Sequence, residues 1–165
     1  MKKLLLAFVL LLSVGAYAQD KTRNISLEFF GAQNTIGVNY DSRFKGNDGW
    51  GYRVGIGYGY GKTDFEETKG VGCPLEINYL LGKKKSKLEL GFGASIGIYN
   101  VTDLIFNSPD DSMFGYLLFG DIGYRYQPTS GFVFRIGVSP SFNFGDEYGL
   151  EKSTFYPYIG FGWAF

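Results

Sequence analysis

Apolar side chains alternate with small or polar ones along eight segments of this sequence. In the segment 132–143, for example, Phe134 and Ile136 fall on one face and Arg135 falls on the other. A β-strand places successive side chains on opposite faces, so this period of two predicts strands that each have one apolar face. The predicted strands are 24–30, 35–44, 50–60, 71–81, 87–99, 114–126, 132–143 and 155–165.

Aromatic residues collect at the ends of the apolar faces, with aliphatic residues between them. Soluble sheets have no reason for this sorting, whereas aromatic rings mark both interfaces of a membrane barrel. Most segments also exceed the roughly five or six residues of a soluble strand. We therefore predict an all-β fold, an eight-stranded antiparallel up-and-down transmembrane β-barrel. The predicted membrane girdle comprises Trp50, Tyr52, Tyr58, Tyr60, Phe114, Tyr116, Tyr124, Tyr126, Phe132 and Phe155.

The connections between the predicted strands alternate between short and long. Membrane barrels have short periplasmic turns and longer outer loops, and an even number of strands puts both termini in the periplasm. The outer loops are a candidate binding surface, because loops on a rigid scaffold commonly carry function. One outer connection, 31–34, is an exception and is nearly a tight hairpin. The short connections are 45–49, 82–86 and 127–131, and the long ones are 61–70, 100–113 and 145–153.

Three prolines fall inside the predicted strands, although proline removes a donor from the hydrogen-bonding ladder. Pro74, Pro140 and Pro157 all lie near the predicted outer ends of their strands. We therefore expect a bulged or frayed outer rim.

Charged residues gather on the face opposite to the girdle. The interior of an eight-stranded barrel is just wide enough for side chains, and buried charges need partners. We therefore predict a network of ion pairs that closes the lumen. Glycines on the same face of 50–60 and 87–99 leave room for water, so a narrow channel for small ions or solutes is the alternative. The predicted lumen charge network comprises Glu28, Asp41, Arg53, Glu76, Glu89, Asp121, Arg125 and Arg135.

The first 18 residues have the pattern of a signal peptide. Lys2 and Lys3 precede a short apolar run, and the small residues at 16 and 18 are typical of a cleavage site. The run is too short to cross about 30 Å of hydrocarbon. We predict a signal peptide at 1–18 and a single outer-membrane β-barrel domain at 19–165.

Composition argues against several classes of function. The sequence has no His and one Cys, Cys73, so a Ser-His nucleophile pair, a metal site and an internal disulfide are not expected. Its 16 basic residues are matched by 16 acidic ones, and no basic face favours nucleic acid. The 25 Gly would suit a disordered chain, but 16 Phe and 13 Tyr argue against disorder. We predict no catalytic residues, no cofactor and no enzymatic activity.

The last predicted strand resembles the C-terminal assembly signal of bacterial outer-membrane barrels, in which an alternating aromatic strand ends in Phe. The residues that carry this resemblance are Tyr158, Phe161, Trp163 and Phe165. The chain after the leader also resembles the short OmpA/OmpX-like outer-membrane β-barrel proteins. The motifs that carry it are NYDSRF at 39–44, YRVG at 52–55, PLEINYLLG at 74–82, LELG at 88–91 and GYRY at 123–126.

This resemblance implies a small, porin-like integral protein of the Gram-negative cell outer membrane, of structural or surface-interaction type. It implies a monomer whose partners are outer-membrane lipid, lipopolysaccharide and, during biogenesis, the barrel assembly machinery. Relatives of this fold include anchors, adhesins, small channels and lipid-modifying enzymes, so the fold alone does not define an activity. A soluble lipocalin-type barrel also has eight strands, but the girdle and Phe165 argue against it.

Overall fold

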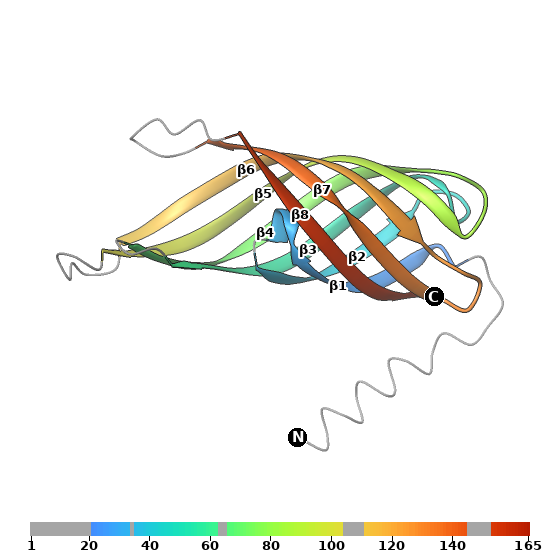
Figure 1. Ribbon diagram of the computed structural model, residues 1–165, viewed down its shortest axis with the longest axis horizontal. Helices are drawn as coiled ribbons and strands as arrows, with labels where there is room; N and C mark the ends of the chain where they lie inside the picture. The colour runs from blue at the N-terminus through green and yellow to red at the C-terminus, as the bar shows by residue number, and fades with distance from the viewer. Residues whose placement is uncertain (1–20, 34, 63–65, 104–110, 145–152) are drawn as a thin grey trace, which may run out of the picture.

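Eight antiparallel strands close into one barrel, in which each strand pairs with its neighbours in the sequence and the first pairs with the last (Figure 1). The computed structural model describes residues 21–33, 35–62, 66–103, 111–144 and 153–165. The predicted fold is confirmed. The strands are β1 (Arg23–Phe30), β2 (Ile36–Arg43), β3 (Gly49–Lys62), β4 (Glu66–Leu81), β5 (Ser86–Asp103), β6 (Asp111–Tyr126), β7 (Phe132–Phe144) and β8 (Ser153–Ala164).

Among the described residues, no helix is long and apolar enough to cross a membrane. The predicted signal peptide at 1–18 lies outside these residues.

The barrel closes where β1 meets β8. Leu27 lies opposite Phe161 in this pairing. At the end of the seam, the Phe165 N–H donates a hydrogen bond to the Arg23 carbonyl oxygen at 2.8 Å. Strands β1 and β8 are therefore paired along the whole of β1, as far as Phe30.

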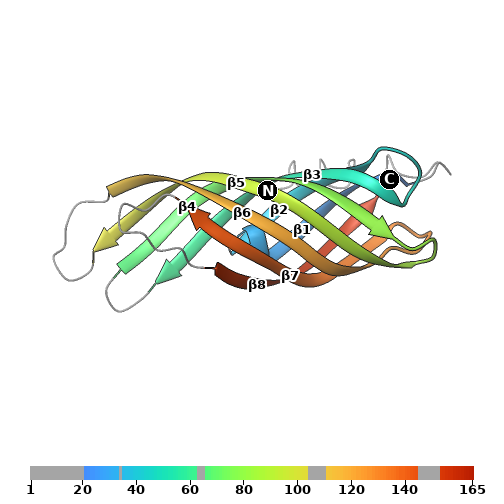
Figure 2. The same ribbon diagram turned by 90° about the horizontal axis from the view of Figure 1, so that it is seen from above.

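The two ends of the barrel differ in height. We call the end with the C-terminus and the connections 44–48, 82–85 and 127–131 the turn end, and the opposite end the loop end (Figure 1). Strands β4, β5 and β6 have 16, 18 and 16 residues, whereas β1 and β2 have 8 each. Figures 1 and 2 show the three long strands extending beyond β1 and β2 at the loop end.

The long strands correct the predicted boundaries. Strand β4 begins at Glu66 rather than at residue 71, and β5 continues to Asp103, four residues beyond the predicted end. The backbone ladder continues through this region, where Glu66 lies opposite Asp103. The sequence there loses its apolar alternation, so the pattern of side chains did not reveal these extensions.

Two of the three prolines, Pro74 and Pro140, interrupt the ladder inside their strands instead of fraying the rim, which corrects the expectation for these two. Pairing between β3 and β4 stops at Leu75 and resumes at Gly72, on either side of Pro74. Pairing between β6 and β7 is likewise interrupted at Pro140, between Val138 and Ser141. Proline has no N–H to donate, so each strand continues past a local gap in its hydrogen bonds. Pro157 pairs with Val138 of β7 and lies just beyond the last pair of β8 with β1.

The connection between β1 and β2 is as short as predicted, since the Phe30 N–H donates a hydrogen bond to the Thr35 carbonyl oxygen at 3.1 Å, but the prediction missed its inward fold. It forms a 3-10 helix, η1 (Gly31–Gln33), that contacts β3, β4, β7 and β8 and therefore lies inside the barrel. Phe30 and Gly31 both have φ of 63°, and these two left-handed residues turn the chain inward. Gly31 is required here, because a Cβ would lie 2.8 Å from Tyr158 Cβ. Ala32 is consequently buried.

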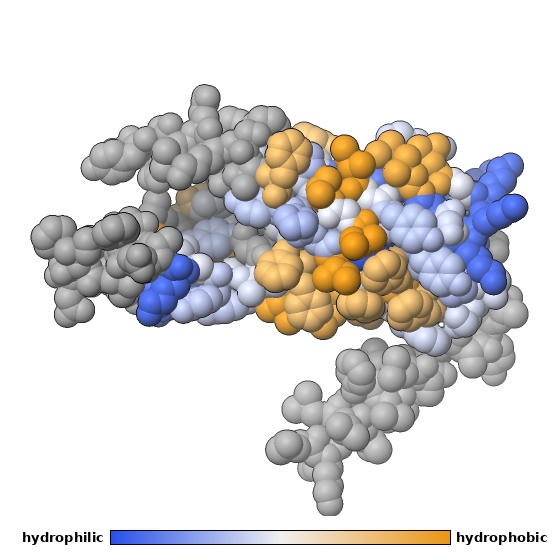
Figure 3. Space-filling model, viewed as in Figure 1, coloured by the Kyte–Doolittle hydropathy of each residue, from blue (hydrophilic) through white to orange (hydrophobic). Residues whose placement is uncertain are grey.

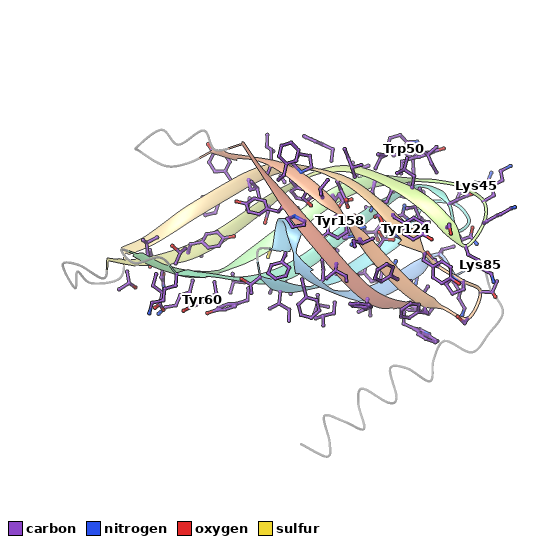
Figure 4. All side chains as sticks on the ribbon, in the orientation of Figure 1. Lys45, Trp50, Tyr60, Lys85, Tyr124 and Tyr158 are labelled. Atoms are coloured by element: carbon purple, nitrogen blue, oxygen red, sulfur yellow. The ribbon has the colours of Figure 1, made fainter. Side chains whose placement is uncertain are left out.

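Apolar side chains cover the outside of the barrel between its two ends. Figure 3 shows them as an orange belt, with hydrophilic residues at the turn end. The predicted girdle residues lie on this surface, and all are exposed except Tyr126, which is half-buried. Among those labelled in Figure 4, Trp50 and Tyr124 lie toward the turn end and Tyr60 lies toward the loop end. Lys45 and Lys85 lie beyond the belt at the turn end.

Candidate functional site: the charged interior of the barrel

Ten charged side chains of the described residues are buried, and they lie on the turn-end side of η1. Five are acidic and five are basic, so their charges balance. They come from seven strands, and their strand positions alternate with the outward apolar residues. An interior this narrow offers little water, so each charge depends on its partners for stabilisation. The ten are Glu28, Asp41, Glu76, Glu89, Asp121, Arg43, Arg53, Lys87, Arg125 and Arg135.

Arg125 joins opposite sides of the barrel. Its Nη2 donates hydrogen bonds to Asp41 Oδ2 at 2.9 Å and to Glu89 Oε1 at 2.8 Å. Asp41 is on β2 and Arg125 is on β6, four strands apart in a ring of eight, so this pair spans the full width of the lumen. Asp41 also accepts hydrogen bonds from Arg43 at 2.7 Å and from Asn78 at 3.1 Å.

Arg53 links two further carboxylates, Glu76 and Asp121, to Glu89. Its Nη1 donates to Glu76 Oε2 at 2.7 Å and to Asp121 Oδ2 at 3.1 Å, and its Nη2 donates to Glu89. Glu76, Glu89 and Asp121 each place one oxygen within 4.8 Å of the others, which is a spacing suited to a metal ion. The Arg53 guanidinium already supplies a positive charge to all three, so the local charge argues against a metal at this position.

Arg135 is the third arginine that joins several carboxylates of the network. It donates hydrogen bonds to Glu28, to Glu89 Oε2 at 3.0 Å and to Asp121 Oδ2 at 2.9 Å. The Tyr158 hydroxyl donates to Asp121 Oδ1 at 2.6 Å. Figure 4 shows Tyr158 near the middle of the barrel, beside η1. The same tyrosine ring lies 4.8 Å from the Arg135 guanidinium carbon, a cation-π distance.

All eight residues of the predicted lumen charge network come together in the interior. The prediction missed Arg43, Lys87 and the Tyr158 hydroxyl. Arg43 follows the inward position Asp41 by two residues, so strict alternation would have found it, but it lies next to a turn. Lys87 lies at the turn end, where it donates a hydrogen bond to the Asn47 carbonyl oxygen.

The residues of the predicted assembly signal divide between the two faces of β8. Phe161, Trp163 and Phe165 are exposed on the outside, whereas Tyr158 is buried inside the barrel. Trp163 also lies under the Lys21 ammonium, which is 5.8 Å from its ring centre. Outside, Cys73 is exposed on the belt, and it is the one cysteine in the sequence.

A cavity of about 10 Å³ separates the network from η1. Ala32 of η1 lines one side, and Glu28, Arg53, Glu76 and Asp121 line the other. The volume is close to that of one water molecule, and Glu76 Oε1 has no hydrogen-bond partner among the described residues. The space between the network and η1 is therefore small and polar.

Comparison with known proteins supports the fold. No family model matches the sequence, and neither does any curated protein. The N-terminal β-barrel domain of Pseudomonas aeruginosa OprF is similar in structure, with a TM-score of 0.58 and 17% identity, over 88% of this chain and 98% of that one.

Two further solved structures are similar. Neisserial surface protein A has a TM-score of 0.54 and 13% identity, over 86% of this chain and 92% of that one. Ail of Yersinia pestis, in complex with the heparin analogue sucrose octasulfate, has a TM-score of 0.52 and 17% identity, over 87% and 97%. The chain therefore has the fold of the small, OmpA-like eight-stranded outer-membrane β-barrels.

Proposed function

We propose that this protein is an integral outer-membrane barrel of structural or surface-interaction type, with a lumen closed by its charge network. The observation that carries the proposal is the ion pair between Asp41 and Arg125, at 2.9 Å across the width of the barrel. An ion or solute has to displace this pair to pass. Removing either partner alone unbalances the buried charges of the network, which is unfavourable even though Asp41 keeps Arg43 and Arg125 keeps Glu89 as partners.

Helix η1 supports closure from the loop end. It covers the network, and only a cavity of about 10 Å³ lies between them. Two obstructions in series, one charged and one formed by backbone, favour a closed barrel over a narrow channel.

In this proposal the turn end faces the periplasm, so that both termini lie there, and outer-membrane lipid and lipopolysaccharide surround the belt. The loop end is the candidate binding surface. In sequence, its three long connections (61–70, 100–113 and 145–153) carry nine acidic and three basic residues. The complementary partner is therefore a cationic surface, because like charges disfavour a polyanion such as the ligand bound to Ail.

Membrane insertion and closure are tested together in proteoliposomes. The refolded barrel is expected to float with the vesicles, to resist alkaline extraction and to leave entrapped potassium in place. Potassium leak from vesicles that carry the inserted barrel would instead favour the alternative, a narrow channel for small ions or solutes. Failure to float would contradict the membrane placement itself.

Recognition by the barrel assembly machinery is proposed to depend on the aromatic end of β8. Deleting Phe165 removes the ring and the hydrogen bonds that its backbone exchanges with Arg23. We expect a lower yield of folded barrel in the outer membrane of cells, while refolding in detergent is affected less. Phe132→Ala, which removes an exposed ring from β7, is the matched control. Normal cellular yield without Phe165 would contradict this role.

A further inference from the structure

The wall of the barrel is lower at β1 and β2 than elsewhere. Pairing between β8 and β1 ends at Tyr158 and Phe30, and pairing between β3 and β2 ends at Tyr58. Beyond these pairs, residues 153–157 of β8 and 59–62 of β3 continue toward the loop end with no described strand between them. Figure 1 shows the outer ends of β8 and β3 well separated, with η1 between the two strands.

At both open edges, local features reduce the number of backbone groups that lack a hydrogen-bond partner. A strand edge at hydrocarbon depth is costly, because no water is present to bond its N–H and C=O groups. On β3, the Thr35 hydroxyl accepts a hydrogen bond from the Tyr60 N–H at 2.9 Å and donates one to the Tyr60 carbonyl oxygen at 3.1 Å. On β8, the first residue beyond the last pair with β1 is Pro157, which has no N–H.

A shallow, open groove lies on the outer surface of β7 and β8, beside the end of β1. One wall is Phe30, which is 55% exposed because its left-handed backbone turns the ring out of the lumen, against the alternation of β1. Positive φ is strained for a bulky residue, and such strain is concentrated at functional sites. The outward side chains that line the groove are Phe30, Ile136, Val138, Pro157 and Ile159.

The level of the groove in the membrane and the chemistry of its side chains indicate its ligand. The girdle residue Phe155 lies two positions beyond Pro157 toward the loop end, about 7 Å along the strand. The groove is therefore inside the apolar belt, at the level of lipid chains. Its outward side chains are all hydrocarbon, so a polar ligand would lose its hydrogen bonds there without replacement.

We propose that this groove binds one acyl chain of a lipid from the leaflet at the loop end. The chain lies between Phe30 and Pro157, against the apolar outer side chains of β7 and β8. It fills the gap in the apolar belt next to the position where β1 ends. This inference rests on the membrane placement proposed above.

Native mass spectrometry of barrels extracted from vesicles of dioleoylphosphatidylcholine and dioleoylphosphatidylglycerol tests the inference. Phe30→Gly removes the groove wall and also relieves the positive φ, so this variant is expected to fold at least as well as the parent. Val138→Trp fills the groove instead. Phe92→Ala is the matched control, because Phe92 is 66% exposed on the belt but lies outside the groove.

The parent and Phe92→Ala are expected to retain one lipid per barrel, and Phe30→Gly and Val138→Trp at least about tenfold less. Equal retention by Phe30→Gly, or no retained lipid in the parent, overturns the inference. A dimer that Val138→Trp abolishes would also overturn it, since the occupant would then be a second barrel. Barrels that float with the vesicles yet carry no lipid contradict only this inference, whereas barrels that do not float contradict the proposed function as well.

Discussion

The two halves of the barrel interior are built differently. On the turn-end side of η1, long charged side chains such as Arg53 and Arg125 reach across the lumen to partners on distant strands. On the loop-end side, the inner face around Tyr99 is formed largely by glycines, including Gly72 and Gly97. The charged half is enclosed by all eight strands, whereas β1 and β2 do not reach the other half. A cross-lumen network needs a wall on every side, and the buried charges among the described side chains lie where that wall is complete.

The inner-face glycines differ in how closely neighbouring atoms approach them. In the charged half, a Cβ on Gly123 would lie 2.0 Å from the Tyr158 hydroxyl, and one on Gly91 would lie 2.2 Å from Glu76 Oε1. These glycines make room for side chains of the network. In the loop-end half, a Cβ on Gly97 would lie 2.7 Å from the Tyr99 ring, so this glycine also makes room for a side chain. Gly115 is less crowded, because a Cβ there would lie 3.2 Å from the same ring, which is a tight but tolerable contact.

The largest expected effect comes from breaking the charged half. Arg135→Met leaves Glu28, Glu89 and Asp121 short of a buried partner, and we expect a loss of about 3–5 kcal/mol in the free energy of unfolding. Urea titration of the barrel in detergent micelles measures this loss. Arg23→Met is the control, because Arg23 is exposed, and it should have little effect. A loss for Arg135→Met below 1 kcal/mol would show that the network contributes little.

A charged residue placed on the outer face of β7 tests whether that face is in contact with lipid. Ile136 directly follows Arg135 but is 47% exposed on the belt. Ile136→Arg is expected to cost about 2–4 kcal/mol if the residue faces the middle of the bilayer. The measurement is urea unfolding in vesicles, with Ile136→Leu as the control. Unchanged stability would mean that the faces of β7 are inverted relative to the membrane.

The smallest effect sharpens the contrast between the two kinds of glycine. Gly123→Ala and Gly115→Ala make the same change on the inner face of β6. We expect Gly123→Ala to cost about 1–3 kcal/mol, because it displaces the Tyr158 hydroxyl from Asp121, and Gly115→Ala to cost less than about 1 kcal/mol. Thermal unfolding of the two variants compares them directly. Equal losses would show that the closer contact at Gly123 does not decide the cost.

Much of this architecture could be predicted from alternation alone. The faces of β7 follow from the order of Arg135 and Ile136, and all eight residues predicted for the network lie inside the barrel. Alternation succeeds because a closed sheet gives each residue only two choices, inward or outward.

The features that escaped prediction depend on backbone geometry. The sequence at Phe30 and Gly31 fits a tight hairpin as well as it fits two left-handed residues leading into η1. The sign of φ at Phe30 is decided by tertiary packing, because nothing in its side chain favours that conformation. The outer part of β4 is held by ladder pairing without apolar alternation, so residues 66–70 read as a loop.

The central claim is that the charge network closes the lumen, and conductance of the refolded barrel in a planar bilayer tests it most directly. The account predicts a silent parent barrel, shown to be inserted. Asp41→Ala combined with Arg125→Ala keeps the net charge but removes only one ion pair and leaves η1 in place, so this variant is expected to stay silent as well. Reproducible steps from the parent, with an ion selectivity that changes in Arg53→Gln, would contradict closure and identify a channel.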